Sequence, residues 1–384
     1  MRAAPARRPL GAGLAALALT VALVAALAAP AAAPASPLDG NGSWIWYLSA
    51  SGGSPGAVAR EAKRNGLDVV YVKSSDGTDR WSQFSPKLVR ALHKRGIEAC
   101  AWPYIYGNDP GREARLTAAA ADAGADCIVI DAESEYEGRY REAYVYMQKL
   151  RRLVGDDYPL ALAGYPYTDY HPTFPYTVFF GDGGAQFNAP QLYWHAIGDP
   201  VREAFAHTYS WNLAYDRPIF PVGQTYEDPG KRELLDFRRY AADYGADGVS
   251  WWSWQETNDS EWSIVGRDGV KGVGGFEPET TFATIERGDA GDMVLLAQEL
   301  LIAAGREAEP SAVFDGRTER AVLRFQQDEG LQESGRIATA TWERLIERRP
   351  ASTNWKKTPV PDVLDRVAPA RRIATELPAG IGRG

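Results

Sequence analysis

The sequence predicts a (β/α)8 TIM barrel of the α/β class, followed by a small three-helix domain. Between about residues 43 and 262, eight short apolar runs recur about thirty residues apart. The runs are continuously apolar, which is typical of strands that are buried on both faces and joined by helical crossovers. From about residue 291, apolar residues instead recur three and four positions apart, as in helices. We therefore expect a barrel over residues 43–275, a linker over 276–290 and a helical domain over 291–348.

The eight candidate strands are the main support for the barrel. They are, in chain order, SWIWYLS, LDVVYVKS, IEACAWPYIYG, ADCIVIDAES, PLALAGYPY, PQLYWHA, PIFPVGQTY and ADGVSWWSWQ. The segments DAGADCIVID and DYGADGVSWW resemble each other four strands apart, as expected of a barrel with half-barrel symmetry. An open doubly wound sheet is the alternative, and it is disfavoured because no glycine-rich nucleotide-binding loop follows any of the runs.

The helices between the strands have recognisable first and last residues. Their starts pair a capping side chain with a proline suited to the first helical position, at Ser54-Pro55, Ser85-Pro86, Asp109-Pro110, Asp199-Pro200 and Asp228-Pro229. Their ends fall at glycines that release the chain into the next strand, namely Gly66, Gly96, Gly124, Gly155 and Gly245. The fifth and eighth helices are expected to be irregular or short, because HPTFPYTVFFGDGGAQF is aromatic and glycine-rich and DSEWSIVG has few residues.

Both ends of the chain differ in composition from the two domains. Residues 1–36 combine early arginines with an Ala/Leu/Val run and small residues suited to signal peptidase, which predicts a signal peptide. The apolar run approaches spanning length, so a retained membrane anchor is the alternative. After cleavage we expect a secreted, extracellular or cell-wall protein without a membrane segment. The Pro/Arg-rich tail, residues 349–384, is expected to be disordered.

Charge and the scarcity of reactive residues exclude several classes of function. The net charge of −8 disfavours nucleic acid as a partner, because phosphate binding needs a concentrated basic face. Cys100 and Cys127 are the only cysteines, and both lie in apolar runs, so buried free thiols are expected in preference to a bridge. The four histidines are scattered without metal-ligand spacing, so neither a metal nor a cofactor is expected.

The stretch IVIDAESEYEG carries the acidic residues that matter most for function. It ends the fourth predicted strand, and the active face of such a barrel is built from the carboxyl ends of its strands. Asp131 and Glu133 lie two residues apart, so both are expected on the inward side of the strand. Two such carboxylates repel each other, and at least one should have a raised pKa suited to a general acid. Glu135 and Glu137 are expected to be solvated loop and first-turn acids.

Aromatic and amide side chains at the other strand ends are expected to line a saccharide cleft. Aromatic faces stack on sugar rings, and amides or phenols hydrogen-bond hydroxyl and N-acetyl groups. The substrate-binding residues expected here are Trp46, Tyr104, Tyr165, Gln191, Tyr193, Gln224, Trp251 and Trp254. Packing is the alternative role for each aromatic, because Trp and Tyr are also large core residues.

The motif IDAE, residues 130–133, resembles the fourth-strand motif of the Chalaropsis-type lysozymes and, more distantly, that of the chitinase-type glycoside hydrolases. The resemblance implies that Glu133 is the catalytic acid and that Asp131 orients the substrate N-acetyl group. It also implies that Tyr193 contacts this acetamido group and that Trp251 forms the floor of the site.

The last domain resembles the peptidoglycan-binding domain type 1 over nearly its whole length. The matching positions are Gln298, Leu301, Gly305, Phe314, Thr318, Ala321-Val322, Phe325-Gln326, Gly330-Leu331, Gly335, Thr341-Trp342 and Leu345. Most of them are core and turn residues, so the resemblance specifies the fold better than the binding groove. The departures are Asp315-Gly316, Ser334 in place of the common aspartate, and Ala338 in place of the usual glycine. A generic three-helix spacer is the alternative.

These resemblances imply a secreted cell-wall protein that binds peptidoglycan or a related N-acetylated polysaccharide. Its barrel would hydrolyse the glycan in a muramidase-like reaction, with Glu133 as the acid and the substrate's own acetamide attacking the anomeric carbon. An inverting route, in which Asp131 activates water, stays open. The alternative to an enzyme is a non-catalytic binding protein with a degenerate barrel, because the first strand end lacks the lysozyme aspartate and Val129 replaces an aspartate of the chitinases. An amidase or peptidase is disfavoured, because no Cys/His or metal set is present.

Overall fold

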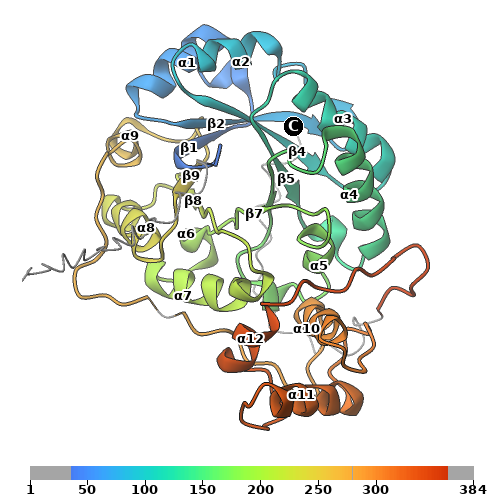
Figure 1. Cartoon of the computed structure of the whole chain (residues 1–384). Coiled ribbons are helices and arrows are strands. Elements are labelled where there is room, and N and C mark those ends of the chain that lie inside the picture. The colour runs from blue at the N-terminus through green and yellow to red at the C-terminus, as the bar shows by residue number, and fades with distance from the viewer. Residues whose placement is uncertain (1–35, 279, 362–384) are drawn as a thin grey trace, which may run out of the picture. The chain divides into compact units, whose positions relative to one another are not determined.

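The computed structural model describes residues 36–278 and 280–361, and a curled parallel sheet runs through the first part (Figure 1). Its strands are β1 Gly40–Ile45, β2 Val69–Asp76, β3 Asp79–Arg80, β4 Glu98–Ile105, β5 Cys127–Ala132, β6 Leu160–Ala163, β7 Phe187–Asn188, β8 Val222–Gln224 and β9 Gly248–Trp252. The hydrogen-bonded order is β7-β6-β5-β4-β2-β1-β9-β8, and the neighbours in this order are parallel. The short β3 pairs antiparallel with the end of β2 and forms a hairpin there.

The two ends of this strand order meet and close the sheet into a TIM barrel. Isolated parallel bridges join Asn188 to Ile219 and Gln191 to Val222. The closed ring confirms the predicted fold class and excludes the open doubly wound sheet. The sixth strand differs from its prediction, because β7 ends before the run PQLYWHA begins. Pro190 opens that run and has no N–H to donate to a ladder, so only isolated bridging follows it.

Helices surround the barrel on its outer side (Figure 1). They are α1 Pro55–Arg64, α2 Pro86–His93, α3 Pro110–Asp122, α4 Tyr140–Val154, α5 Tyr176–Phe179, α6 Trp194–Ile197, α7 Val201–Asn212, α8 Lys231–Asp243 and α9 Asp259–Val265. The crossovers expected to be short are short, since α5 has 4 residues and α9 has 7. Among the described residues, no helix combines the length and the apolar character needed to cross a membrane.

The predicted helix boundaries are largely confirmed. The Ser54 and Asp109 side chains accept hydrogen bonds from backbone N–H groups of the first turns of α1 and α3. All five glycines expected to end helices have φ between +63° and +94°, a conformation that favours glycine. The two later starts are displaced, because α7 begins at Val201 and α8 begins at Lys231 after the N-cap Gly230.

Apolar side chains pack on both faces of the barrel sheet. The interior holds Trp44, Val69, Tyr71, Cys100, Trp102, Cys127, Val129, Ala161, Ala163, Ala189, Phe220 and Val222. The other face packs against the helices through a larger cluster of aliphatic and aromatic side chains. Burial of each large side chain of this kind stabilises the fold by roughly 1.5–3 kcal/mol.

Cys100 and Cys127 form a disulfide in the barrel interior, so the prediction of free thiols is wrong. The two residues are register partners on β4 and β5, and both point inward. Their Cα atoms lie 4.7 Å apart, within the range that a disulfide requires. The sequence showed that both residues lie in apolar runs, but it did not give the register that makes them partners.

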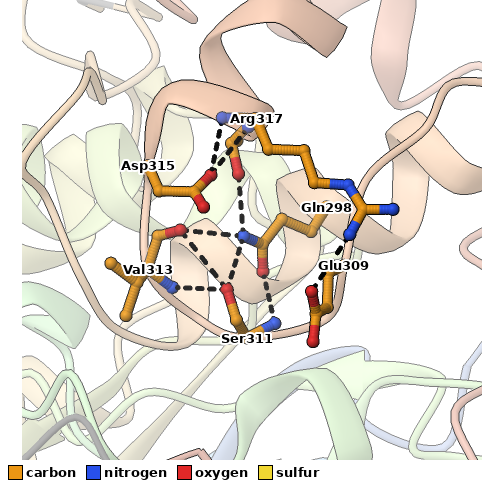
Figure 2. A network of polar contacts seen from close by, with 7 residues as sticks. Gln298, Glu309, Ser311, Val313, Asp315 and Arg317 are labelled. Carbon is orange, nitrogen blue, oxygen red and sulfur yellow. Dashed lines mark hydrogen bonds and ion pairs between the residues drawn. The ribbon is translucent and has the colours of Figure 1, made fainter.

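The C-terminal domain consists of α10 Asp292–Ala303, α11 Gly316–Asp328 and α12 Thr339–Leu345. Gln298 of α10 holds the loop before α11 through both ends of its amide (Figure 2). Its Nε2 donates to Ser311 Oγ, Val313 O and Thr318 Oγ1, and its Oε1 accepts from the N–H groups of Ser311 and Ala312. The buried glutamine is therefore a packing residue of this domain.

Gln326 of α11 repeats this arrangement at the next loop. Its Nε2 donates to Ser334 Oγ, Arg336 O and Thr341 Oγ1, and its Oε1 accepts from Gly335 N. The two loops have equivalent geometry, because each places a residue with positive φ directly after the serine. The matched glutamines and threonines of the sequence thus fix the fold of the domain rather than line its surface.

The predicted linker is partly integrated into the C-terminal domain. Ile285 forms a β-bridge with Ile337, and Ala290 forms one with Val313. The described residues of the segment 276–290 therefore do not form a free tether.

The predicted tail is not disordered where the structure describes it. Trp355 is 2% exposed, and its ring packs at 5.0 Å from that of Tyr140 on α4. Arg141 Nε donates to the Trp355 carbonyl. The prediction of disorder is therefore wrong for residues 349–361, because a buried aromatic side chain holds this segment. Residues 362–384 and nearly all of the predicted signal peptide lie outside the described residues.

The barrel and the C-terminal helices belong to one compact unit. The first residue of α10, Asp292, attaches these helices to the barrel. Asp292 is 1% exposed, and its carboxylate accepts from Thr177 N at 2.9 Å, Thr177 Oγ1 at 2.8 Å and Tyr215 OH at 3.0 Å. Burial raises the pKa of Asp292 to about 7, although these donors act in the opposite direction. Glu299, also on α10, accepts a hydrogen bond from Thr353 Oγ1. Burial raises the pKa of Glu299 to about 8.

Candidate active site

Asp131 and Glu133 lie at the carboxyl end of β5 and face the barrel interior, together with the inward residues Cys127 and Val129. Asp131 is the register partner of Tyr104 on β4 and of Ala163 on β6. Asp131 is 6% exposed, and Glu133 is partly buried. The alternation along the strand therefore places both acids inside, as the sequence predicts.

One amide serves both carboxyl groups. Gln191 Nε2 donates to Asp131 Oδ1 at 3.0 Å and to Glu133 Oε1 at 3.1 Å. In the part of the chain that the structure describes, the arginine ion pairs all go to other acids. The two acids are therefore held next to each other without a direct arginine partner.

This arrangement raises the pKa of both acids. Burial raises the pKa of Glu133 to about 7, the Gln191 amide lowers it, and the charge of Glu135 raises it. Burial also raises the pKa of Asp131 well above its usual range, and the neighbouring charge of Glu133 adds to this. Lys73 acts in the opposite direction on both groups. A carboxylic acid with a pKa near 7 is suited to donating a proton at neutral pH.

The two later acids of the stretch are bound to other side chains, which differs from the expectation of solvated acids. Glu135 Oε2 accepts from Tyr104 OH at 2.9 Å, and it lies in a 3-10 turn, Ser134–Tyr136. Glu137 accepts from Thr173 Oγ1 at 2.7 Å and contacts His171 Nδ1 at 2.8 Å. Both acids precede α4, which begins only at Tyr140; Glu135 lies in the first turn of the 3-10 helix, and Glu137 follows that helix.

Several predicted binding residues surround the acid pair. Tyr165 stacks on His171 with ring centroids 3.4 Å apart. Burial raises the pKa of the Tyr165 hydroxyl, and the charge of Glu133 raises it further. Tyr193 is 7% exposed and packs edge-on against Tyr226. Trp46 lies at the end of β1 and packs against the interior cluster. Together with Tyr104 and Gln191, these side chains occupy the carboxyl end of the barrel.

Trp251 is not part of this site, so its predicted role as floor tryptophan is wrong. Its ring is fully buried between the sheet and the helices, where it packs on Phe237 and donates to Asn41 Oδ1. Its neighbour Trp252 points inward, at 5.3 Å from the Trp102 ring. Side chains alternate along a strand, so Trp252, and not Trp251, is the inward-facing tryptophan of β9.

Gln224 and Trp254 were predicted to bind substrate, but both side chains are buried and contact other parts of the protein. Gln224 is 0% exposed, and its Oε1 accepts the N–H groups of His195 and Ala196 in the first turn of α6. The side-chain amide of Gln224 is therefore hydrogen-bonded to the backbone of α6. Trp254 is 4% exposed, packs against Trp262 of α9, and borders a polar cavity of about 630 Å³ beside α1 and α9.

Three residues at the carboxyl end of the barrel were not predicted as site residues: Trp252, Trp81 and Asp76. Trp81 and Asp76 belong to the β2–β3 hairpin, whose polar sequence SDGTDRW gives no apolar strand signal. The dipeptide Asp76-Gly77 is a hairpin turn signal and could have located it. No comparable signal distinguishes Trp252 from Trp251.

A possible metal-ligand group lies elsewhere in the barrel. Among the described residues, His93, Glu98 and Asp126 place ligand atoms within 4.8 Å of one another. They lie near the amino-terminal ends of β4 and β5, opposite the acid pair. His93 Nε2 and Asp126 Oδ2 lie 2.8 Å apart, and Asp126 also accepts a hydrogen bond from Ala99 N, so the Asp126 carboxylate already has two partners.

Comparison with known proteins identifies the C-terminal domain. Residues 290–345 match the family model of a peptidoglycan binding domain. A peptidoglycan-binding protein from Clostridioides difficile, solved in complex with glutamine hydroxamate, is 35% identical over 16% of this chain and 40% of its own, with a TM-score of 0.16. The C-terminal helices are therefore a peptidoglycan-binding domain, as the sequence predicts, rather than a generic spacer.

The barrel has similar structures at low sequence identity. The spore cortex-lytic enzyme SleL from Bacillus cereus is 10% identical, over 59% of this chain and 73% of its own, with a TM-score of 0.48. A chitinase from Chromobacterium violaceum is 12% identical, over 59% of this chain and 98% of its own, with a TM-score of 0.43. No curated protein matches the chain in sequence. The barrel assignment itself rests on the sheet topology described above.

Proposed function

We propose that this protein is an exported cell-wall glycoside hydrolase that binds peptidoglycan through residues 290–345 and cleaves N-acetylated glycan at the carboxyl end of its barrel. The observation that carries the proposal is the buried acid pair with one shared amide donor, Asp131 and Glu133 on Gln191. A buried carboxyl group is costly unless it is fully bonded or has a use. A binding domain in the same chain would raise the local concentration of the glycan at the barrel.

In the proposed reaction, Glu133 donates its proton to the glycosidic oxygen as the bond to the anomeric carbon breaks. The substrate's acetamide oxygen attacks that carbon, and Asp131, with Tyr193, orients the acetamide and accepts its N–H. Water then opens the cyclic intermediate and returns a proton to Glu133. Glu133 fits the role of acid because its pKa is raised to about 7 by burial.

The spacing of the two acids favours this route over an inverting one. A single nitrogen lies within 3.1 Å of an oxygen of each carboxyl group, so these two oxygens are close together. Inverting enzymes separate their carboxyl groups by roughly 6.5–9.5 Å to admit a water molecule between acid and sugar. The shared donor leaves less room than that.

Export is supported by the disulfide between Cys100 and Cys127. Disulfides form and persist in oxidising compartments and are rare in a reducing cytosol. The amino-terminal sequence, with arginines before an apolar run, agrees with this location.

The test is clearing of purified peptidoglycan in a gel or in suspension. The parent protein is expected to clear the substrate, and Glu133→Gln is expected to abolish clearing, because the amide cannot donate the proton. Glu203→Gln, an exposed position on α7, is the matched control and should clear like the parent. Clearing that survives Glu133→Gln would remove Glu133 from the reaction.

A second candidate is a non-catalytic wall-binding protein, favoured by the closed state of the site. Asp131 is 6% exposed, and Tyr193 and Tyr226 are 7% and 3% exposed. In this case neither the parent nor Glu133→Gln clears the substrate, while both sediment with insoluble peptidoglycan. Clearing by the parent excludes this candidate.

A further inference from the structure

Lys73 is a buried cation at the carboxyl end of the barrel. It lies on β2, and its side chain is 4% exposed. Its Nζ donates to Asp76 Oδ2 at 2.8 Å, and Asp76 is 27% exposed. A buried ammonium is rare unless it is paired, because the loss of its hydration is costly.

Four aromatic rings surround the ammonium and form what we call the aromatic cage. The distances from Nζ to the ring centroids are 4.9 Å for Trp46, 4.7 Å for Trp81, 4.9 Å for Trp102 and 5.7 Å for Tyr104. Each ring face attracts a cation, and the attraction grows when water is excluded. The cage therefore holds the Lys73 ammonium in position among four ring faces.

The cage lies next to the acid pair across β4. Lys73 is the register partner of Trp102, and Asp131 is the register partner of Tyr104, two residues further along the same strand. The titratable groups that act on the pair or on which the pair acts come from the surrounding elements: Lys73, Asp76, Tyr104, Tyr106, Glu135, Tyr165, Tyr193 and Tyr226. Lys73 is the one cation in this group of described residues.

The balance of charge at this end of the barrel is therefore negative. Asp76, Asp131, Glu133 and Glu135 are four carboxyl groups, and Lys73 supplies one positive charge to them. Without that charge, burial and mutual repulsion would favour a proton on both Asp131 and Glu133. The proposed reaction needs one proton on the pair, because Glu133 donates a proton while Asp131 accepts the acetamide N–H.

We propose that Lys73 is a positioning residue that keeps the Asp131 and Glu133 pair at a single shared proton near neutral pH. Its ammonium acts through space and touches neither the substrate nor the breaking bond. The inference rests on the proposed function for its use in catalysis, but the proton count of the pair is a property of the protein alone.

The test is a titration of the two carboxyl groups by ¹³C NMR on protein labelled at the side-chain carboxyls of Asp and Glu. The Asp131→Asn and Glu133→Gln variants assign the two signals. Lys73→Met removes the charge and keeps an apolar stem in the cage. Both titration midpoints are then expected to move upward, by about one pH unit, because an opposite charge at close range lowers an acid's pKa by about that much or more.

Two further variants complete the titration test. One is expected to shift a titration midpoint in the opposite direction, and the other is expected to leave both midpoints unchanged. Asp76→Asn removes a carboxylate whose charge raises the pKa of Asp131, so the Asp131 midpoint is expected to move downward. Lys87→Met, at an exposed position on α2, removes the same charge far from the site and is expected to leave both midpoints unchanged. A merely structural role for Lys73 would not produce an upward shift in Lys73→Met beside no shift in Lys87→Met.

The outcomes separate this inference from the proposed function. Unchanged midpoints in Lys73→Met, or in Lys73→Gln should Lys73→Met fail to fold, overturn the role of Lys73 even if the parent clears peptidoglycan. The expected shifts support it even if the parent clears nothing. If the parent is active, the pH profile of clearing should move upward in Lys73→Met and downward in Asp76→Asn.

Discussion

The protein buries carboxyl groups in two regions, and the two regions treat them differently. At the junction with α10, Asp292 receives three hydrogen bonds from two barrel residues, Thr177 and Tyr215. At the carboxyl end of the barrel, Asp131 and Glu133 share one amide donor. Burial raises the pKa in both regions, so a raised pKa alone does not distinguish a functional acid from a structural one. The two regions differ in the number of dedicated donors.

The largest contrast is expected from removing the acid group in each region. Glu133→Gln should lower peptidoglycan clearing by about 10²–10⁴-fold, the usual contribution of general acid catalysis. Its free energy of unfolding should not fall, because the amide is isosteric and loses a charge that burial disfavours. Clearing assays and urea unfolding on the same preparation measure both. If the free energy of unfolding of Glu133→Gln fell far enough to explain the loss of clearing, the role of Glu133 as the acid would be contradicted.

In contrast to Glu133→Gln, Asp292→Ala is expected to lower the free energy of unfolding. It leaves three buried donors without their acceptor, and we expect a loss of about 3 kcal/mol in the free energy of unfolding. Urea denaturation monitored by tryptophan fluorescence measures this change. Glu333→Ala, exposed in the loop between α11 and α12, is the control and should be neutral. An equally small effect of both substitutions would show that the junction does not stabilise the protein.

The pH dependence of stability sharpens the comparison. The folded-state pKa of Asp292 is raised from 3.8 to about 7, so the folded protein binds this proton more tightly than the unfolded chain does. Its contribution is therefore complete below about pH 4 and is lost as the pH rises towards 7. Asp292→Asn cannot ionise, and the decline in stability over this window should be shallower in the variant than in the parent. Parallel curves for the two proteins from pH 4 to pH 8 would be inconsistent with this assignment.

The smallest expected effect concerns the two equivalent loops of the C-terminal domain. Gly335 has φ of +71°, and a Cβ there would approach Glu319 Cγ to 3.3 Å. Gly335→Ala should therefore cost about 1–2 kcal/mol in the free energy of unfolding. Gly305→Ala is a useful comparison, because its φ of +74° carries the same strain but a Cβ would meet no atom within 4 Å. A larger loss at Gly305 than at Gly335 would contradict the role given to the Glu319 contact.

The sequence allowed the fold to be predicted where the signal is local. Positive φ at Gly66 or Gly155, and proline at the first position of α1, follow from backbone preferences that neighbouring residues set. The inward direction of Asp131 and Glu133 also follows from alternation along a single strand.

The features that the sequence did not reveal depend on contacts between distant segments. The disulfide requires the register of β4 against β5, and the burial of Trp355 requires Tyr140, more than two hundred residues away. The choice between Trp251 and Trp252 depends on the phase of β9 against β1, where Ser43 pairs with Trp251 on the outer face. None of these relations leaves a pattern in the neighbouring residues.

The closure of the barrel has a consequence for the motions of the site. Between β7 and β8, the described structure joins the ring by isolated bridges, and one of them runs from Gln191 to Val222. The residue that supplies the shared amide thus lies at the edge where the ring closes. Opening of that edge would move the Gln191 side chain away from both acids at once, so backbone hydrogen exchange at Gln191 and Val222 would report on how well the acid pair is held together.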